Sequence, residues 1–147
     1  MAKNALRQPD FFSSQIAEAR RFYMDLDPSP GDPLAVVSGG REHCLPDYEI
    51  KRPGFEYWGI EFVAQGVGTL VLDGEAYQLS GGTLFAYGPG IAQHIRTDSR
   101  QPMVKYFIDF AGARGEELLG EFAPQPGCVV QTSAPGEVLA IFDELIC

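Results

Sequence analysis

The sequence predicts a mainly β protein: an antiparallel β-barrel of the jelly-roll type, with a helix before it and helices after it. Apolar and polar residues alternate over short runs between residues 55 and 110, which is the period of a strand. Turns that contain glycine, such as Asp73-Gly74, separate these runs. The flanking segments repeat apolar residues at helical spacing instead.

Residues 1–33 are expected to form an N-terminal arm and a helix. Ser13 or Ser14 can accept hydrogen bonds from the first turn of a helix over residues 15–24. Prolines and a glycine between residues 25 and 33 then end this helix. Residues 1–12 lack strong periodicity, so we treat them as a candidate lid over the mouth of the barrel.

Residues 34–111 are expected to form the barrel. The first strand covers residues 34–38, Gly39 and Gly40 interrupt it, and residues 41–46 continue it toward a turn. Asp73-Gly74 suits the tight hairpin turn that a two-residue connection favours. The remaining strands are expected at residues 55–65, 69–72, 75–79, 83–87 and 103–110.

Residues 112–147 are expected to form a C-terminal helical segment. The pattern predicts a helix over residues 114–122, an extended stretch at 128–131 and a helix from residue 135. The last helix reaches Cys147 without a glycine or another stop signal. We therefore expect a chain cut inside a helix that leads to a further domain.

Composition and charge limit the classes of function. A chain of 147 residues with 45% hydrophobic and 21% charged residues is typical of one soluble domain. No apolar stretch approaches the ~20 residues that span a bilayer, and no secretory signal is present at the N-terminus. Three cysteines without zinc-type spacing indicate reduced thiols, so a cytoplasmic protein without membrane contact is expected. The net charge of −9 repels phosphate backbones, so this domain by itself should not bind DNA.

The glycines between residues 52 and 110 have a spacing that resembles the cupin pattern, whose barrel is a double-stranded β-helix. A metal-binding cupin shows G-x5-H-x-H-x4-E-x6-G, followed by G-x5-P-x-G-x2-H. The ligand positions of that pattern hold Ile60, Phe62, Val67 and Gln93 in this chain. Zinc, iron and copper prefer imidazole, thiolate or carboxylate donors. We therefore expect a barrel without a metal or another cofactor.

A longer series of motifs is similar to the N-terminal sensing and dimerisation domain of AraC-type transcriptional regulators. The matching positions are Arg52-Pro53, Trp58, residues 62–68, Asp73-Gly74, residues 82–85, residues 87–90, His94 and residues 106–110. The resemblance implies a cupin-like barrel that binds a small-molecule effector, and a homodimer formed through helices after the barrel. It also implies a DNA-binding part with two helix-turn-helix units, which this chain does not contain.

The first group of candidate ligand-binding residues lies between residues 52 and 62: Arg52, Trp58, Ile60 and Phe62. The cupin frame points Trp58, Ile60 and Phe62 inward and Glu61 outward. Core packing is the alternative, and we favour it for Ile60 and Phe62, whereas Trp58 suits a sugar face or an aromatic ligand. Arg52 matches an effector-contacting position by resemblance, and a surface arginine is the alternative.

Gln93, His94, Lys105 and Phe107 complete the candidate site. His94 follows the cupin histidine position by one residue, and such a shift on a strand turns a side chain to the opposite face. The alternation in residues 104–110 places Lys105, Phe107 and Asp109 on one face of a strand. From this pattern we expect Asp109 to lie in solvent. The resemblance places Lys105 and Phe107 in the pocket instead, so the position of Lys105 stays open.

The function expected from these patterns is ligand sensing without catalysis. The effector is a sugar or a small carboxylate, since both suit Trp58 and Arg52. One alternative is a small metal-independent cupin enzyme, a sugar epimerase or isomerase, with an acid–base pair drawn from Glu61, His94 and Lys105. Another is a dimeric scaffold with a packed barrel and no ligand.

Overall fold

The structure of this chain is a computed structural model that describes residues 13–29, 31–121 and 129–146. The predicted lid at residues 1–12 and the end of the chain at Cys147 lie outside the described residues. The elements in chain order are β1 (Ile16–Tyr23), β2 (Ala35–Cys44), β3 (Glu49–Arg52), β4 (Trp58–Gln65), β5 (Val67–Leu72), β6 (Glu75–Ser80), β7 (Thr83–Tyr87), β8 (Gln93–Thr97), β9 (Val104–Ala111), α1 (Ala113–Glu121), β10 (Val129–Gln131) and α2 (Pro135–Ile146).

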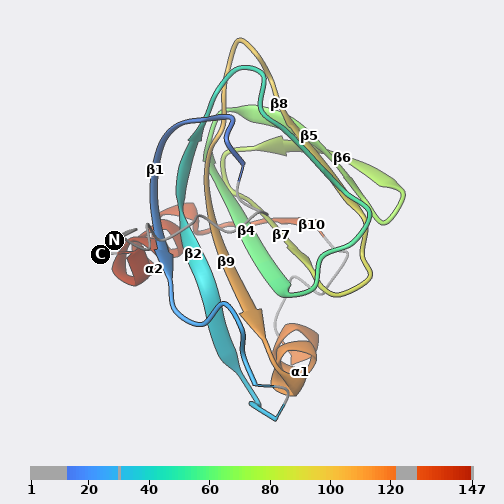
Figure 1. Cartoon of the computed structure of the whole chain (residues 1–147). Coiled ribbons are helices and arrows are strands. Elements are labelled where there is room, and N and C mark those ends of the chain that lie inside the picture. Colours follow the sequence, from blue (N-terminus) through green and yellow to red (C-terminus); the bar gives the residue numbers. More distant parts are fainter. Residues whose placement is uncertain (1–12, 30, 122–128, 147) are drawn as a thin grey trace, which may run out of the picture.

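The strands form two antiparallel sheets that face each other. The larger sheet has the order β1-β2-β9-β4-β7-β10, and the smaller sheet has the order β3-β8-β5-β6. Figure 1 shows the sheets wrapped around a shared interior, with α1 and α2 outside the larger sheet. The mainly β, antiparallel fold predicted from the sequence is confirmed.

An apolar core fills much of the space between the sheets. Its largest fully buried members come from both sheets, because every second residue of each strand points inward. They are Val63, Leu70, Leu72, Leu79, Phe85, Tyr87 and Ile95, together with Tyr48 and Met103 from the connections. Burial at about 25 cal/mol per Å² of apolar surface makes this cluster the main source of stability for the sandwich.

The predicted hairpin at Asp73-Gly74 is confirmed. Asp73 has a φ of 50° and Gly74 a φ of 85°, the left-handed angles that a type I′ turn requires. The turn joins β5 to β6, and the two strands pair from Val67 opposite Ser80 to Leu72 opposite Glu75. A short local signal was sufficient here because the turn depends only on its own residues.

The predicted helix over residues 15–24 is wrong, because this segment is strand β1. It pairs with β2 along its length, with Arg21 opposite Gly40. Helix propensity is a weak preference that a long neighbouring strand overrides by offering a ladder of backbone hydrogen bonds. Ser13 accepts a hydrogen bond from the Gln15 N–H at 3.0 Å, but this contact forms a local turn before the strand.

The predicted interruption at Gly39-Gly40 is also wrong, since β2 runs through both glycines. A Cβ on Gly39 would lie 2.6 Å from the ring of Phe22, and a Cβ on Gly40 would lie 2.6 Å from the carbonyl oxygen of Arg20. The glycines therefore make room for β1 to pack on β2. They do not end the strand.

The expected helices after the barrel are confirmed, and they cover the outer face of the larger sheet. On α2, Phe142 packs against Phe62 and Tyr106. On α1, Leu119 packs in a cluster with Ala86 and Phe110. Neither α1 nor α2, the helices in the part of the chain that the structure describes, is long and apolar enough to cross a membrane.

Candidate ligand-binding site

Charged side chains gather on the inner face of the larger sheet, where an apolar core is usual. Glu42 on β2 lies opposite Lys105 on β9, and Ser38 on β2 lies opposite Asp109 on β9. Glu61 on the adjacent strand β4 points to the same side, and all of these residues are buried. Buried charges need partners, so the contacts of each one define what the site can do.

Lys105 lies at the centre of this cluster. Its ammonium Nζ donates to Glu42 Oε1 at 2.9 Å and to Glu61 Oε1 at 2.8 Å. Burial alone would lower the pKa of Lys105, but the two carboxylates outweigh it and raise that pKa well above its usual value. Lys105 is therefore a permanent cation that holds β2, β4 and β9 together.

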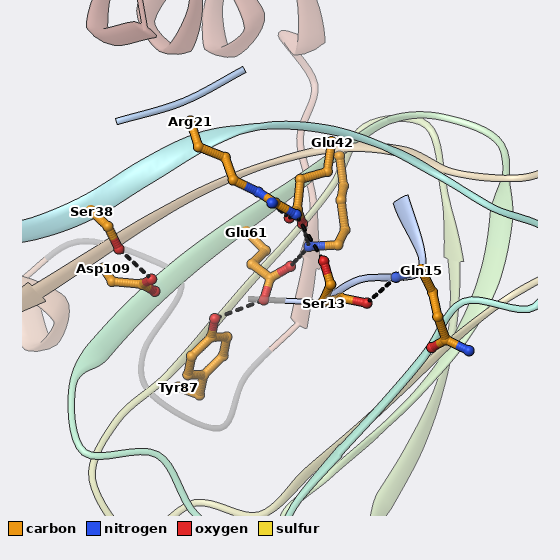
Figure 2. Close-up of polar contacts among 9 residues, drawn as sticks. Ser13, Gln15, Arg21, Ser38, Glu42, Glu61, Tyr87 and Asp109 are labelled. Carbon is orange, nitrogen blue, oxygen red and sulfur yellow. Dashed lines mark hydrogen bonds and ion pairs between the residues drawn. The ribbon is translucent and has the colours of Figure 1, made fainter. Parts of the chain in front are cut away.

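Glu42 receives a second cation from the edge strand β1. Arg21 donates to Glu42 Oε2 from Nη2 at 2.6 Å and from Nε at 3.0 Å, as Figure 2 shows. Burial favours the neutral acid, yet Lys105 and Arg21 together lower the pKa of Glu42. Arg21 Nη2 also donates to the carbonyl oxygen of Ser13 at 3.0 Å, which fixes the segment that leads into β1.

Glu61 is satisfied by a tyrosine as well as by the lysine. The Tyr87 hydroxyl donates to Glu61 Oε2 at 2.7 Å. Its ring lies against Gly59, where a Cβ would collide with the ring, so this glycine permits the position of the tyrosine. Burial and the charge of Glu61 raise the pKa of Tyr87 well above its usual value, and the hydroxyl remains a donor.

Asp109 is the least satisfied acid of the cluster. Ser38 Oγ donates to Asp109 Oδ2 at 3.1 Å, whereas Oδ1 has no hydrogen-bond partner among the described residues. The residue is only 2% exposed. Burial and the neighbouring charge of Glu61 raise the pKa of Asp109 to about 7, although Ser38, Arg52 and Lys105 oppose this shift.

These side chains surround a small polar cavity inside the barrel. The cavity offers about 20 Å³ to the centre of a water molecule, which is room for about one water in its present form. Its lining comes from both sheets and from the segment before β1: Ser13, Glu42, Tyr48, Ile50, Arg52, Glu61, Tyr87, Lys105, Phe107 and Asp109.

Three of the predicted ligand-binding residues, Arg52, Lys105 and Phe107, meet at this cavity. The guanidinium of Arg52 lies 4.9 Å from the ring centre of Phe55, and Lys105 Nζ lies 5.4 Å from that of Phe107. The open question about Lys105 is thereby answered, since it faces the interior.

The expectation that Asp109 lies in solvent and that Glu61 points outward is wrong. Alternation along residues 104–110 predicts a solvated face for Asp109, and the cupin frame points Glu61 outward, but both side chains are buried and accept hydrogen bonds from neighbouring strands. Pairing is a long-range property that a single strand does not reveal.

The inward direction predicted for Trp58, Ile60 and Phe62 is also wrong. All three lie on the outer face of the larger sheet, where they pack with residues of α1 and α2. The indole of Trp58 fits where Gly88 and Gly115 lack a side chain, because a Cβ on either glycine would collide with it. The helices cover part of this face: Phe62 is buried, whereas Trp58 and Ile60 are half-buried.

Gln93 and His94 point to opposite sides of the smaller sheet. Gln93 is 2% exposed, and its amide nitrogen and oxygen have no hydrogen-bond partner among the described residues. His94 lies on the outer face, where its Nε2 is 2.6 Å from Glu49 Oε2. The predicted change of face between these neighbours is confirmed, and it places His94 outside the barrel.

The inner face does not fit a metal of the cupin type. At the level of the expected ligands it presents Glu61, Val63 and Gln93, and the single carboxylate among them already accepts from Lys105 and Tyr87. Across the described ranges, no group of three histidine, cysteine, aspartate or glutamate side chains is placed to hold a metal ion.

The fold and the lined cavity define a cupin-type domain that encloses a polar site. The family model described as AraC-like ligand binding domain matches residues 36–146, so the chain belongs to this family. The resemblance to the sensing domain of AraC-type regulators is thereby confirmed at the level of the ligand-binding domain.

Solved structures support the cupin fold. The plu4264 protein from Photorhabdus luminescens is 17% identical, with a TM-score of 0.52 over 80% of this chain and 97% of its own. A Cupin 2 conserved barrel domain protein from Salinispora arenicola is 17% identical, with a TM-score of 0.50 over 71% and 83%. YhaK from Escherichia coli is 12% identical, with a TM-score of 0.57 over 81% and 53%. These likenesses show the fold alone, and no curated protein matches the chain.

Proposed function

We propose that this domain binds a small-molecule effector inside its barrel and acts in transcriptional regulation through a DNA-binding domain joined to it. Membership of the AraC-like ligand binding family supports the first part of the proposal. The observation that carries it is the buried polar cavity, in which Asp109 Oδ1 has no partner among the described residues. A barrel with only a structural role would gain more from an apolar interior, because burying charges costs free energy even when they are paired.

The cavity combines a polar floor with aromatic walls, which is typical of small-molecule sites. Tyr48, Tyr87 and Phe107 supply the walls. Because the present cavity holds about one water, a larger effector requires side chains to move apart as it enters. Ser13, at the N-terminal side of β1, lines the cavity, and among the described residues its hydrogen-bond partners are Arg21, through its carbonyl oxygen, and Gln15, through its hydroxyl.

Binding is tested by filling the cavity. Neutral sugars, amines and small carboxylates are screened by scanning fluorimetry, and a compound that raises the melting temperature is measured by calorimetry. Ile50→Phe places a larger side chain in the cavity and should weaken binding at least tenfold. Val71→Phe, on the exposed outer face of the same sheet, is the matched control and should bind as the wild type does. Equal affinity in Ile50→Phe would place the ligand elsewhere.

We propose further that the domain binds its ligand without converting it. Lys105 and Glu61, two of the groups considered for acid–base catalysis, hold each other in an ion pair, and His94 lies outside the barrel. General acid–base catalysis needs a group that is free to exchange a proton with the substrate. Proton NMR of a bound sugar, followed over hours with the protein, should show no new product. An epimerised or isomerised sugar would favour the enzyme.

Dimerisation through α2 is the last part of the proposal. Ile141 is 61% exposed and Leu145 is 50% exposed, and they lie one helical turn apart on the side of α2 away from the sheet. A second copy packed on this stripe would remove it from water. Sedimentation equilibrium should give a dimer for the wild type and a monomer for Leu145→Glu. Val71→Glu, exposed on the smaller sheet, should remain dimeric.

A further inference from the structure

Asp109 differs from the other two buried acids of the cavity in what its oxygens contact. Glu42 accepts hydrogen bonds from Arg21 and Lys105, and Glu61 accepts from Lys105 and Tyr87. Among the described residues, Asp109 accepts a hydrogen bond from the neutral hydroxyl of Ser38 on Oδ2 and none on Oδ1. The cluster therefore satisfies its glutamates and leaves an acceptor of Asp109 unused.

The unused oxygen, Oδ1, belongs to a residue that lines the cavity and is only 2% exposed. A buried carboxylate oxygen without a hydrogen bond is costly, and native proteins rarely leave one without a partner such as a water or a ligand. The cavity beside it has room for a group of about that size. Asp109 thus supplies an unused acceptor within the lining of a cavity that admits about one water-sized group.

A second unsatisfied group lies at the same end of the barrel. Gln93 is also 2% exposed, and both polar atoms of its amide lack a partner among the described residues. On the smaller sheet Gln93 lies directly opposite Arg52, which lines the cavity together with Asp109. Gln93 itself does not line the cavity, so Asp109 supplies the acceptor on which the inference rests.

We infer that Asp109 determines the class of effector: the ligand donates a hydrogen bond to Asp109 Oδ1 from a hydroxyl or an ammonium group, and carboxylates are rejected. This inference rests on the proposed binding function. Above pH 7, where Asp109 is ionised, neither Asp109 nor a carboxylate ligand carries a donor, so the ligand would place an anionic oxygen against Oδ1 and leave that acceptor unsatisfied. A site built around a hydrogen bond discriminates strongly against ligands that cannot make it.

The charges around the cavity do not reverse this preference. When Asp109 is ionised, the cations Arg21, Lys105 and Arg52 are matched in number by Glu42, Glu61 and Asp109, so no net positive charge attracts an anion. Lys105 and Arg21 are also held by the glutamates. The hydrogen-bonding capacity of the lining therefore decides, and among its buried side-chain atoms in the described residues Asp109 Oδ1 is the one without a hydrogen-bond partner.

The size of the cavity limits which part of the ligand reaches Asp109. About 20 Å³ admits one small polar group and not a whole sugar ring. A terminal hydroxyl or a primary ammonium fits this description. The hydroxyl and the ammonium both donate a hydrogen bond, but only the ammonium is charged. Neutral and cationic probes can therefore distinguish them.

The test compares three classes of small probe on the wild-type domain by calorimetry at pH 8, where Asp109 is ionised. Glycerol and erythritol are the neutral donors, ethylamine and putrescine are the ammonium donors, and acetate and succinate are the carboxylates. At least one donor class should bind, and the carboxylates should bind at least tenfold more weakly. Preference for the first or second class identifies the hydroxyl or the ammonium as the source.

Variants then assign the selectivity to Asp109. Asp109→Asn keeps the shape and can still accept from Ser38, but it loses the charge, so donor affinity should fall at least tenfold. Glu49→Gln makes the matched change on the outer face, beside His94, and should leave affinity within twofold. Circular dichroism checks that each variant is folded, and the wild-type comparison of probes stands without any variant.

Two results would overturn the inference while leaving the proposed function intact. The first is wild-type affinity for carboxylates equal to or above that for donors. The second is unchanged donor affinity in Asp109→Asn. If no probe class binds to the folded wild type, the inference fails together with the proposed function.

Discussion

The two faces of the larger sheet use the same strands in opposite ways. On β9, Lys105, Phe107 and Asp109 point into the barrel, whereas Tyr106, Ile108 and Phe110 point outward. On β4, Glu61 points inward beside Lys105, and Phe62 packs against Phe142 of α2. The charged face is thus the inside of the barrel, and the apolar face is covered by helices.

This difference shows that the two faces have different roles in the free energy of folding. The outer face gains stability by burying apolar surface under α1 and α2. The inner face loses solvation and regains it only through matched contacts, such as those of Lys105 with Glu42 and Glu61. Such an arrangement adds little net stability, so we attribute it to the ligand that the interior is proposed to bind.

The largest expected effect comes from removing the central cation. Lys105→Met leaves Glu42 and Glu61 buried without their shared partner, which should lower the free energy of unfolding by about 3–5 kcal/mol. Urea unfolding monitored by circular dichroism measures this change. The triple variant Lys105→Met, Glu42→Gln, Glu61→Gln removes the charges together and should recover part of the loss. A loss below about 1 kcal/mol in the single variant would show that the ion pairs are not buried as described.

The next effect is the pH dependence caused by Asp109. Its pKa is raised to about 7 by burial and by Glu61 on β4, against Ser38 on β2, Arg52 on β3 and Lys105 on β9. Between pH 4 and pH 7 the folded state binds a proton that the unfolded state has released, so this residue lowers stability as pH rises. The full cost above pH 7 is at most about 4 kcal/mol.

Asp109→Asn should remove that cost, so its stability advantage over the wild type should grow from pH 4 to pH 8. Urea unfolding of both proteins over this range gives the difference, in which the opposite contribution of Glu42 cancels. Because the pKa of Glu42 is lowered in the folded state, this residue stabilises the fold near neutral pH. That stabilisation is lost as the pH falls. A constant difference across the range would mean that Asp109 titrates as an ordinary surface acid.

Much of the fold was predictable because its signals are local. The hairpin at Asp73-Gly74 and the strand-rich block follow from turn chemistry and from alternation along short runs. The segment 16–23 was mistaken for a helix because its strand form depends on pairing with β2, which is not visible in its own residues. Pairing with a strand distant in sequence therefore determines the secondary structure of this segment, and its local pattern does not.

The candidate site was predictable only in part, for the same reason. Alternation correctly placed Lys105 and Asp109 on one face, but it did not say which face is buried. Charged residues suggest solvent unless partners such as Glu42 and Arg21 from other strands are known. The helices that cover Trp58 and Phe62 are likewise far away in sequence. One available signal was missed: acids at positions 42 and 61 match the lysine at 105 in a strand-rich chain.

A smaller effect is expected on the outer face. Ile60 is half-buried, packs against the clusters of Phe62 and Phe110 and lines an apolar pocket beside α1, so Ile60→Val removes one methylene from a partly packed site. The loss of stability should be about 0.5–1.5 kcal/mol. Ligand affinity should stay within twofold, since the side chain does not reach the cavity. A large loss of binding with little loss of stability would make the outer face part of the ligand site.

The smallest effect is expected for the ion pair outside the barrel, which is the exposed counterpart of the Lys105 cluster. His94 Nε2 lies 2.6 Å from Glu49 Oε2, but both side chains are substantially in solvent, where water and salt screen the interaction. His94→Ala should leave the urea midpoint and the ligand affinity unchanged within error at 0.15 M salt. A clear loss of ligand affinity in this variant, with Glu49→Gln unaffected, would move the functional site from the interior to the outer face of the smaller sheet. In that case, the burial of an ion pair would not distinguish the functional site from ordinary surface charges in this domain.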